Sequence, residues 1–277
     1  MSLHSPLKTE ARNPRTMNLD KATPIELVRM LNEESRRAVE AVAAAEREIA
    51  EAIERISEGM SRGGRLIYVG AGTSGRLGAL DAAECPPTFG VGYDRVVALM
   101  AGGEKAFFKA AEGAEDNAEA GRGDIAALDI TADDSVVGIS AAGGAKYVVA
   151  AVEYAAGCGA FTAAVVCNPD TPLGAAASLT IFADTEAEAL TGSTRLKAGT
   201  AQKLILNSIS TGVMARLGYV YENIMINVKP TNEKLLRRAA GIAAELSSSS
   251  LENALAAVEA EGSVMAAIER LKGEVEI

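Results

Sequence analysis

The chain has no tryptophan and only 4% aromatic residues, so it lacks the rings on which proteins stack sugars and nucleic-acid bases. Its one histidine, His4, lies in a polar tail ahead of any periodic pattern, which argues against a histidine triad and a histidine-bound zinc ion. A formal net charge of −10 with no basic cluster disfavours binding to nucleic acid or to an anionic membrane. Acid–base chemistry in this chain therefore depends on carboxylates, lysine, tyrosine or thiols.

Cysteines are few and show no functional spacing. Cys85, Cys158 and Cys167 form neither a CxxC pair nor a metal-ligand pattern, so we expect reduced thiols, no metal site and a cytoplasmic protein. We find no signal-peptide pattern and no apolar run of membrane length. With 277 residues, 48% of them hydrophobic and 23% charged, the chain suits one α/β domain with smaller helical pieces.

A glycine-rich turn is the most informative stretch of the sequence. The apolar run from Leu66 to Val69 predicts a buried parallel strand, and it leads into Gly70–Gly75 and then a helical pattern. The first N–H groups of a helix have no intrahelical partner, and glycines let the backbone approach a ligand. With Thr73 and Ser74 as added hydroxyl donors, this turn predicts an anion-binding site.

Glu84 lies at the far end of this expected helix, where the pair Pro86–Pro87 should stop it, and it is a candidate catalytic carboxylate. The same glycines also match G-x-G-x-x-G, the fingerprint of dinucleotide binding. That fingerprint requires an acidic residue at the carboxyl end of the next strand, which we expect over residues 96–100. The nearest acid, Asp94, precedes that strand, so we disfavour a nicotinamide or flavin cofactor.

Strand and helix patterns alternate along the chain. Apolar runs predict strands over residues 66–69, 96–100, 135–140, 161–167 and 179–182. Helical patterns lie between them, including a tract over residues 104–127, and one long amphipathic helix over residues 20–60 precedes them. This alternation predicts a doubly wound parallel sheet, which binds ligands at the carboxyl ends of its strands. The turns at 72–75 and 140–145 should then be neighbours.

The helical pattern of residues 195–217 begins with a charge that needs an explanation. Ser193 or Thr194 is a natural N-cap for it. Lys197 lies in its first turn, where the macrodipole disfavours a cation unless an anion is near. Lys197 either extends over the core or contacts a bound substrate, and the sequence leaves both readings open. Two further short helices, over residues 251–259 and 264–271, predict a small C-terminal module for packing or partner binding.

Five motifs give the chain a resemblance to a known family. Residues 70–90 (GAGTSGRLGALDAAECPPTFG) and 191–203 (TGSTRLKAGTAQK) closely resemble the N-acetylmuramic acid 6-phosphate etherases, as do TEARNP at 9–14, AEGAED at 111–116 and PTNEK at 230–234. The resemblance implies the sugar isomerase (SIS) fold, an α/β fold with a five-stranded parallel sheet flanked by helices. It implies cytoplasmic homodimers whose chain is divided into an N-terminal tail and helices (1–60), an SIS phosphosugar-binding domain (61–230) and a ubiquitin-associated-like (UBA-like) helical module (231–277).

The activity that the resemblance implies is cleavage of the D-lactyl ether of N-acetylmuramate 6-phosphate, by elimination and then water addition, without a metal or cofactor. It assigns the acid to Glu84, which would protonate the departing lactate, and the base to Glu115, which would remove the C2 proton. Composition alone would place Glu115 on a solvated, acidic helix face. Two other readings stay open: a non-catalytic sugar-phosphate-binding regulator similar to the glucokinase regulatory protein of animals, and an SIS-type aldose–ketose isomerase.

The expected substrate-binding residues come from three loops and are Gly72, Thr73, Ser74, Ser140, Gly143, Lys146, Ser193, Thr194 and Lys197. The second loop departs from the family pattern. Etherases usually read A-A-S-G-R-T-P-Y where this chain reads SAAGGAKY over residues 140–147, so Ala142, Gly144 and Ala145 replace a serine, an arginine and a threonine. Ser140 keeps one hydroxyl, and Lys146 is either an exposed, screened charge or a replacement for the lost arginine. The altered loop leaves the physiological substrate open.

Overall fold

The computed structural model describes residues 7–109, 111–227 and 233–273. His4 and residues 230–232 of the PTNEK motif lie outside these ranges. Contacts between Cα atoms divide the chain into two compact units: a sheet unit, Met1–Ala82 with Asp94–Thr211, and a C-terminal unit, Ala83–Tyr93 with Gly212–Ile277. Within the described residues, no helix is long and apolar enough to cross a membrane.

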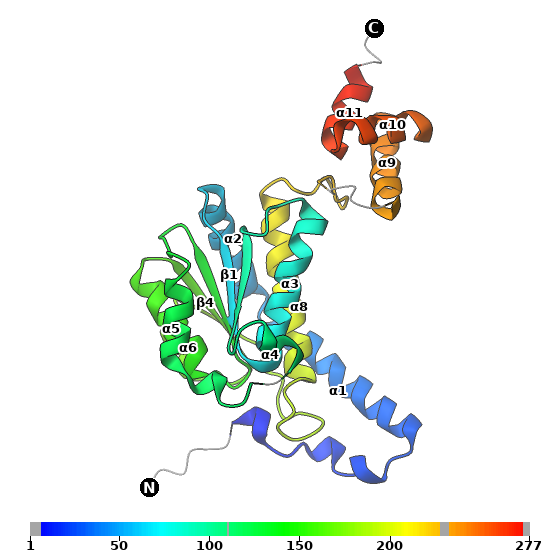
Figure 1. The fold of residues 1–277 in the computed structure, drawn as a ribbon. Coiled ribbons are helices and arrows are strands. Elements are labelled where there is room, and N and C mark those ends of the chain that lie inside the picture. The colour runs from blue at the N-terminus through cyan, green and yellow to red at the C-terminus, as the bar shows by residue number, and fades with distance from the viewer. Residues whose placement is uncertain (1–6, 110, 228–232, 274–277) are drawn as a thin grey trace. The chain divides into compact units, whose positions relative to one another are not determined.

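The sheet unit is built on five parallel strands: β1 (Leu66–Gly70), β2 (Val96–Met100), β3 (Ser135–Ile139), β4 (Phe161–Val166) and β5 (Leu179–Phe182). The strands form one sheet, in which Figure 1 labels β1 and β4. Their order is β2-β1-β3-β4-β5, with Leu66 opposite Val96 on one side and Ser135 on the other. The predicted parallel sheet is confirmed, and each strand lies within one residue of its predicted bounds. From β1 the chain goes outward to β2 and then returns to the other side of β1 as β3. The strand order therefore reverses between β1 and β3, the point at which such sheets bind ligands.

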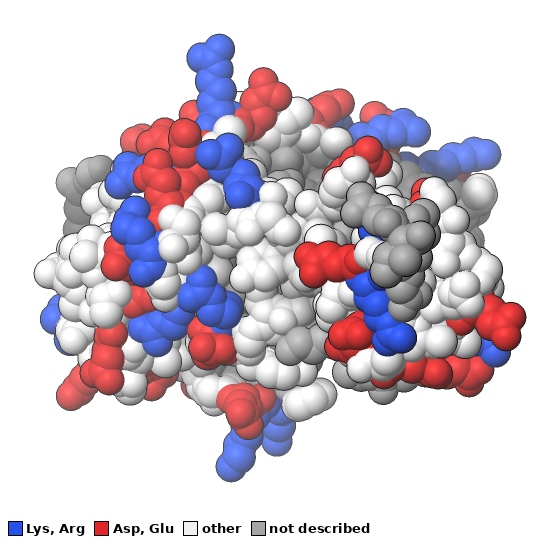
Figure 2. All heavy atoms as spheres, turned by 90° about the horizontal axis from the view of Figure 1, so that it is seen from above, with Lys and Arg blue, Asp and Glu red and all other residues white. Residues whose placement is uncertain are grey.

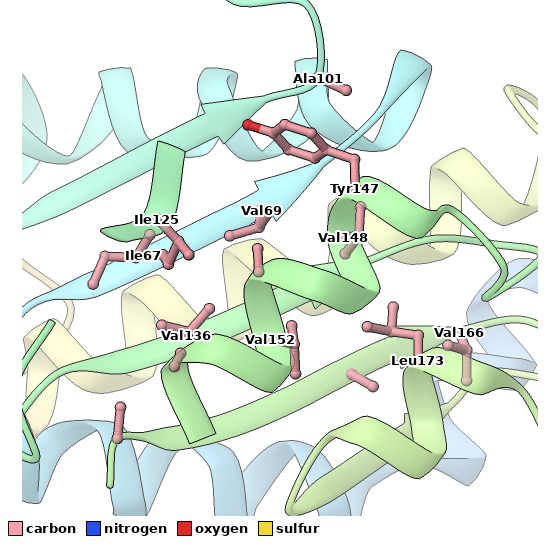
Figure 3. Packing of buried hydrophobic residues seen from close by; sticks show 14 residues of the cluster. Ile67, Val69, Ala101, Ile125, Val136, Tyr147, Val148, Val152, Val166 and Leu173 are labelled. Atoms are coloured by element: carbon pink, nitrogen blue, oxygen red, sulfur yellow. The ribbon is translucent and has the colours of Figure 1, made fainter. Parts of the chain in front are cut away.

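The main hydrophobic core of this unit lies between the sheet and the helices α5 (Ala118–Ala126) and α6 (Lys146–Gly157) (Figure 3). Side chains alternate across a strand, so Ile67 and Val69 of β1 enter this core while Tyr68 faces the other layer. The phenol of Tyr147 is buried with them, and its hydroxyl donates to Asp124 Oδ2 at 2.7 Å. The short helix α7 (Pro172–Ala176) closes the core at its β4 side.

The other face of the sheet is covered by α2 (Glu46–Ser61) and by those parts of α3 (Gly72–Phe89) and α8 (Lys197–Arg216) that belong to this unit. Gly78 allows α3 to approach closely, because a Cβ there would lie 3.0 Å from the Cβ of Tyr68. Asp81 of α3 accepts hydrogen bonds from Tyr68 on β1 and from Asn207 and Ser210 on α8. This buried carboxylate thus joins β1, α3 and α8.

The predicted helix over residues 20–60 is two helices, α1 (Pro24–Ala44) and α2, because Ala45 leaves helical backbone with φ −100° and ψ 16°. Three 3₁₀ turns precede α1, namely η1 (Lys8–Glu10), η2 (Pro14–Thr16) and η3 (Leu19–Lys21). The apolar side chains of α2 are buried, whereas α1 leaves several more than half exposed: Ile25, Val28 and Val39.

Two other boundary predictions are wrong. The pair Pro86–Pro87 does not stop α3, which continues to Phe89; proline suits helical φ, and the last turn still closes because Gly90 N donates to Pro86 O at 2.9 Å. The tract over residues 104–127 is interrupted, forming α4 (Lys105–Phe108), the 3₁₀ turn η4 (Ala114–Asp116) and α5. Gly113, with φ +73°, takes the left-handed conformation that separates η4 from the residues before it.

The C-terminal unit contains α9 (Glu233–Ser247), α10 (Leu251–Glu261) and α11 (Val264–Gly273), which share a small core that includes Ala243, Val258 and Ile268. The Ser250 hydroxyl caps α10 by accepting from Asn253 N at 3.2 Å, and Gly262 ends the helix with φ +64°. The two short helices predicted over residues 251–259 and 264–271 are confirmed.

Acidic and basic side chains are intermixed over the face that Figure 2 presents. Each of the two units also has exposed ion pairs of its own, such as Arg62 with Asp133 at 2.6 Å in the sheet unit and Arg237 with Glu233 at 2.9 Å in the C-terminal unit. Pairs of this kind add little stability but cancel charge locally. On this face the acidic excess of the chain is therefore distributed rather than gathered in one patch.

Candidate active site

The glycine-rich turn after β1 lies against the first turn of α3. A Cβ at Gly70 would lie 2.6 Å from Gly75 N, and a Cβ at Gly75 would lie 2.8 Å from Gly70 O, so these two positions require glycine. Gly72 begins α3 with φ +55°. Because the turn follows β1 at the point where the strand order reverses, the free N–H groups of the first turn of α3 lie at the expected ligand crevice.

A cavity of about 350 Å³ opens beside this turn. Three segments contribute to its lining: the turn and α3 (Ala71, Gly72, Arg76), the end of β2 (Met100, Ala101) and the stretch around η4 (Ala106, Ala111, Glu112, Gly113, Ala114, Glu115). The structure therefore brings the predicted base Glu115 and the predicted substrate-binding Gly72 to one site. Glu115 is exposed there, so its carboxylate is accessible to a ligand.

Arg76 holds the segment that leads to Glu115. Its Nε donates to Phe107 O at 2.7 Å and its Nη2 donates to Ala106 O at 2.8 Å, at the end of α4. The same segment packs on the backbone after β2, where a Cβ at Gly102 would lie 2.7 Å from the Cβ of Ala111. Sequence reasoning missed Arg76, and the only signal was its position two residues after Ser74 in the glycine-rich motif.

The second predicted loop lies between β3 and α6, next to β1. Gly143 has φ +71°, and a Cβ there would lie 2.3 Å from the Cβ of Thr171, so this position requires glycine. Gly143 N donates to Ser140 O at 3.0 Å and to Ser140 Oγ at 3.1 Å, which leaves the hydroxyl hydrogen of Ser140 for another acceptor. A Cβ at Gly144, where the family carries arginine, would meet nothing within 4 Å.

Lys146 begins α6 and lies close to the turn that carries Glu115. Its Nζ is 3.6 Å from Asp116 Oδ1, and both side chains are about two-thirds exposed (66% and 67%). An exposed pair at this distance is weak and screened by solvent. Lys146 is therefore available to a bound anion at the cost of one weak contact, and its replacement of the lost arginine stays a prediction.

Lys197 is buried instead of being exposed to a ligand. Its side chain is 1% exposed, and its Nζ donates to Glu34 Oε2 at 2.5 Å and to Ala187 O at 2.6 Å. Burial raises the pKa of Glu34, but hydrogen bonds from Arg15, Lys197 and Asn13 outweigh it and lower the pKa to about 2. The anion that the sequence requires near Lys197 is thus a carboxylate of α1, which favours the packing reading of this lysine.

The start of α8 is capped by a residue that sequence reasoning missed. The helix begins at Lys197, so the prediction of an N-cap at Ser193 or Thr194 is wrong, and both residues lie partly exposed in the preceding turn. The N–H groups of Lys197 and Ala198 instead donate to the carboxylate of the buried Glu188 at 3.0 and 2.9 Å. Burial raises the pKa of Glu188 against the effect of these hydrogen bonds. No local pattern marks Glu188, because it lies nine residues before the helix.

Thr73 and Ser74 lie against α8. A Cβ at Gly199 would lie 3.5 Å from Thr73 Cγ2. The Ser74 hydroxyl donates to Gln202 Oε1 at 2.9 Å, and both side chains are buried. The two longest sequence motifs, residues 70–90 and 191–203, are therefore in direct contact although they lie far apart in the sequence.

Glu84 is exposed on α3, twelve residues after Gly72. Glu84 belongs to the C-terminal unit and is not among the residues that line the cavity. The catalytic roles of Glu84 and Glu115 stay predictions.

Comparisons with known proteins extend the sequence resemblance. The family model described as glucokinase regulatory protein N-terminal SIS domain matches residues 48–156. An N-acetylmuramic acid 6-phosphate etherase of Pectobacterium atrosepticum is 51% identical over 253 residues, covering 91% of this chain and 84% of that protein. One of Halalkalibacterium halodurans is 54% identical over 239 residues, covering 86% and 80%. A solved phosphoheptose isomerase from Francisella tularensis shares the fold with a TM-score of 0.53 at 17% identity, covering 70% of this chain and all of that one.

Proposed function

The chain belongs to the N-acetylmuramic acid 6-phosphate etherase family, and we infer that it is a carbon–oxygen lyase acting on that phosphosugar. The bond that breaks is the ether between C3 of the sugar and D-lactate. Water takes the place of lactate, so the products are N-acetylglucosamine 6-phosphate and D-lactate.

The reaction proceeds by elimination and then addition. In the ring-opened sugar the C1 aldehyde acidifies the C2 proton, which Glu115 removes while the C3–O bond breaks. Glu84 protonates the departing lactate oxygen and then takes a proton from the water that attacks C3, and C2 regains its proton. One acid and one base are sufficient for these steps.

The observation that supports this assignment most is that Glu115 shares a cavity with the glycine turn at the strand reversal. We place the phosphate at the second loop, where the start of α6, the hydroxyl of Ser140 and the ammonium of Lys146 offer donors. The sugar then occupies the cavity beside Gly72. The exposure of Glu115 suits a base that must reach a carbon-bound proton.

A regulator that binds the phosphosugar without turnover is the second candidate. The open space at Gly144 and the match of residues 48–156 to the glucokinase regulatory protein domain favour it. A hydrogen bond to a charged partner contributes roughly 1.5–3 kcal/mol, so losing two hydroxyls from the loop lowers affinity by about a hundredfold or more. An SIS-type aldose–ketose isomerase is a weaker candidate, since the solved isomerase supports the fold alone.

The deciding experiment is incubation with N-acetylmuramate 6-phosphate and an assay for D-lactate. Release of lactate at a rate comparable to a curated relative supports the etherase. Binding of the phosphosugar in a thermal-shift assay with no lactate release identifies the regulator. Exchange of the C2 proton with aldose–ketose interconversion and no lactate identifies the isomerase.

We further propose a cytoplasmic homodimer that takes a phosphosugar as substrate and binds neither nucleic acid nor membrane. The exposed apolar side chains Ile25, Val28 and Val39 on α1 support a protein–protein contact there. The cysteines Cys158 and Cys167 are free thiols, as suits a reducing compartment.

A further inference from the structure

A hydroxyl of the proposed substrate site is held by a residue to which no role has been given. Ser74, one of the predicted substrate-binding residues, lies in the first turn of α3; Gly72 and Arg76 of that helix line the cavity, and Ser74 itself faces α8. Its Oγ donates to Oε1 of Gln202 at 2.9 Å, and Gln202 lies on the second turn of α8. A serine hydroxyl carries a single hydrogen, so in this arrangement Ser74 cannot donate to a substrate.

The amide of Gln202 is only half used. The residue is 1% exposed, and among the described residues its Nε2 has no hydrogen-bond partner although that atom is fully buried. Leaving a buried N–H group unpaired is unfavourable, and such groups are rare in folded proteins. The unpaired donor lies on the same amide that accepts from Ser74.

A half-turn of this amide exchanges its two atoms: Nε2 gains Ser74 as a partner, and Oε1 moves to the place where Nε2 has none. Oxygen and nitrogen of a carboxamide occupy nearly the same volume, so the turned group fits the same space. Nε2 would then donate to Ser74 Oγ, and the hydroxyl hydrogen of Ser74 would be free to point away from α8. The two orientations differ in which partner donates, and a ligand oxygen in front of Ser74 stabilises the turned one.

We propose that Gln202 is a positioning residue that donates to Ser74 and thereby directs the Ser74 hydroxyl at an oxygen of the bound substrate. This inference rests on the proposed function, because it assumes that a phosphosugar occupies the cavity. We call these two hydrogen bonds the relay: the amide N–H of Gln202 donates to the Ser74 oxygen, and the Ser74 hydroxyl donates to the ligand. Gln202 itself touches no substrate atom.

Two substitutions at Gln202 separate the relay from packing. Gln202→Glu keeps the shape of the side chain, but its carboxylate only accepts and therefore keeps the Ser74 hydrogen. Gln202→Met keeps the length and leaves Ser74 without a partner on α8. With N-acetylmuramate 6-phosphate as substrate, Gln202→Glu should raise KM by about tenfold or more, with a smaller change in kcat. Ser74→Ala should have the same effect. Gln202→Met should raise KM less than Gln202→Glu, because its Ser74 hydroxyl is free to rotate.

A double-mutant cycle tests the link between the two residues. In the Ser74→Ala background, Gln202→Met should have no further effect on KM, whereas independent residues would multiply their effects. Ser208→Ala, which removes an exposed hydroxyl from the same helix, is the matched control and should leave KM unchanged. Thermal unfolding of each variant reports whether the fold persists.

The outcome separates the relay from the proposed function. If Gln202→Glu has the KM of the wild type, or if the two substitutions multiply their effects on KM in the cycle, Gln202 does not position Ser74. Release of lactate by the wild type would still support the etherase activity in that case. If the wild type releases no lactate, the same cycle is read from the Kd of N-acetylglucosamine 6-phosphate by calorimetry. Coupling there supports the relay in a binding protein, and its absence overturns it.

Discussion

At the scale of single residues, two exposed carboxylates carry the proposed chemistry. Glu84→Gln and Glu115→Gln should each lower kcat by about 100- to 10,000-fold, because a positioned acid or base contributes that much. Both variants should still bind N-acetylglucosamine 6-phosphate. Glu112 lines the same cavity as Glu115 and provides the control, since Glu112→Gln should keep most activity. A nearly normal rate for either catalytic variant removes that residue from the mechanism.

Lys146 is the residue in which the loop departs most from its relatives. Lys146→Met should weaken binding of N-acetylglucosamine 6-phosphate by about tenfold or more, since a cation next to the phosphate is lost. Stability should stay the same or rise slightly, because a lysine at the start of a helix opposes the macrodipole. Calorimetry with the phosphorylated and the unphosphorylated sugar measures both affinities, and the affinity for the unphosphorylated sugar should be the same in Lys146→Met and the wild type.

The partner of Lys146 offers the matched control. Asp116→Asn removes the carboxylate 3.6 Å from the ammonium and leaves the positive charge. It should bind the phosphosugar as well as the wild type or more tightly. Equal binding by Lys146→Met and the wild type would leave the altered loop without a compensating charge.

At the scale of elements, the start of α8 depends on two buried carboxylates, Glu34 and Glu188. Glu34→Gln should destabilise the fold by about 3–5 kcal/mol, because the Lys197 ammonium would stay buried without the carboxylate that it pairs with directly. Lys197→Met should lower the free energy of unfolding by less than Glu34→Gln does, since Arg15 and Asn13 still donate to Glu34. Urea unfolding measures both. The reverse order of the two losses would contradict the role given to this network.

The same network predicts a pH dependence. The pKa of Glu34 is lowered from 4.5 to about 2, so its contribution to stability is complete above about pH 4.5 and is lost as the pH falls towards 2. The difference in unfolding free energy between wild type and Glu34→Gln should therefore shrink over that range. The pKa of Asp134 is also lowered to about 2, and its loss is common to both proteins. A constant difference between pH 5 and pH 2.5 would contradict this prediction.

How far the sequence predicts these elements depends on whether their causes are local. β2 lies at its predicted residues because it is a continuous apolar run of strand length, and β5 does so because Thr180 is the single polar residue among its four. The break at Ala45 has no proline or glycine to announce it. The interruption before η4 depends on a positive φ at Gly113, and glycine is common within helical patterns as well.

In the candidate site too, the sequence predicts what has a local cause and misses contacts between distant residues. Gly72 and Glu115 line one cavity, because the glycine turn follows β1 and the segment around η4 follows the neighbouring strand β2. The partners of Lys197 and Ser74 are 163 and 128 residues away, at Glu34 and Gln202. A pattern within one helix holds no information on such contacts, so the sequence predicts neither of these partners.

At the scale of the whole molecule, the proposed dimer makes a prediction about the two glutamates. Glu84 is not among the residues that line the cavity of its own chain, which suits action on the cavity of a second subunit. Mixing inactive Glu84→Gln with inactive Glu115→Gln should then restore lactate release, because a mixed dimer has one site with both wild-type glutamates. Light scattering should show a dimer at micromolar concentration. A monomer, or a mixture without activity, would contradict shared sites.

The pairing of Glu34 with Lys197 also has a consequence for how the protein is made. The carboxylate leaves the ribosome long before the ammonium, which follows 163 residues later. At about 5–20 residues per second this interval lasts roughly 10–30 seconds. During that time Glu34 has no lysine to pair with. The apolar side chains of the nascent α1, including Ile25, Val28 and Val39, are open to chaperones or to another nascent chain. The side chains that suit a dimer contact are thus synthesised before the last helix of the sheet unit, α8, can pair with α1.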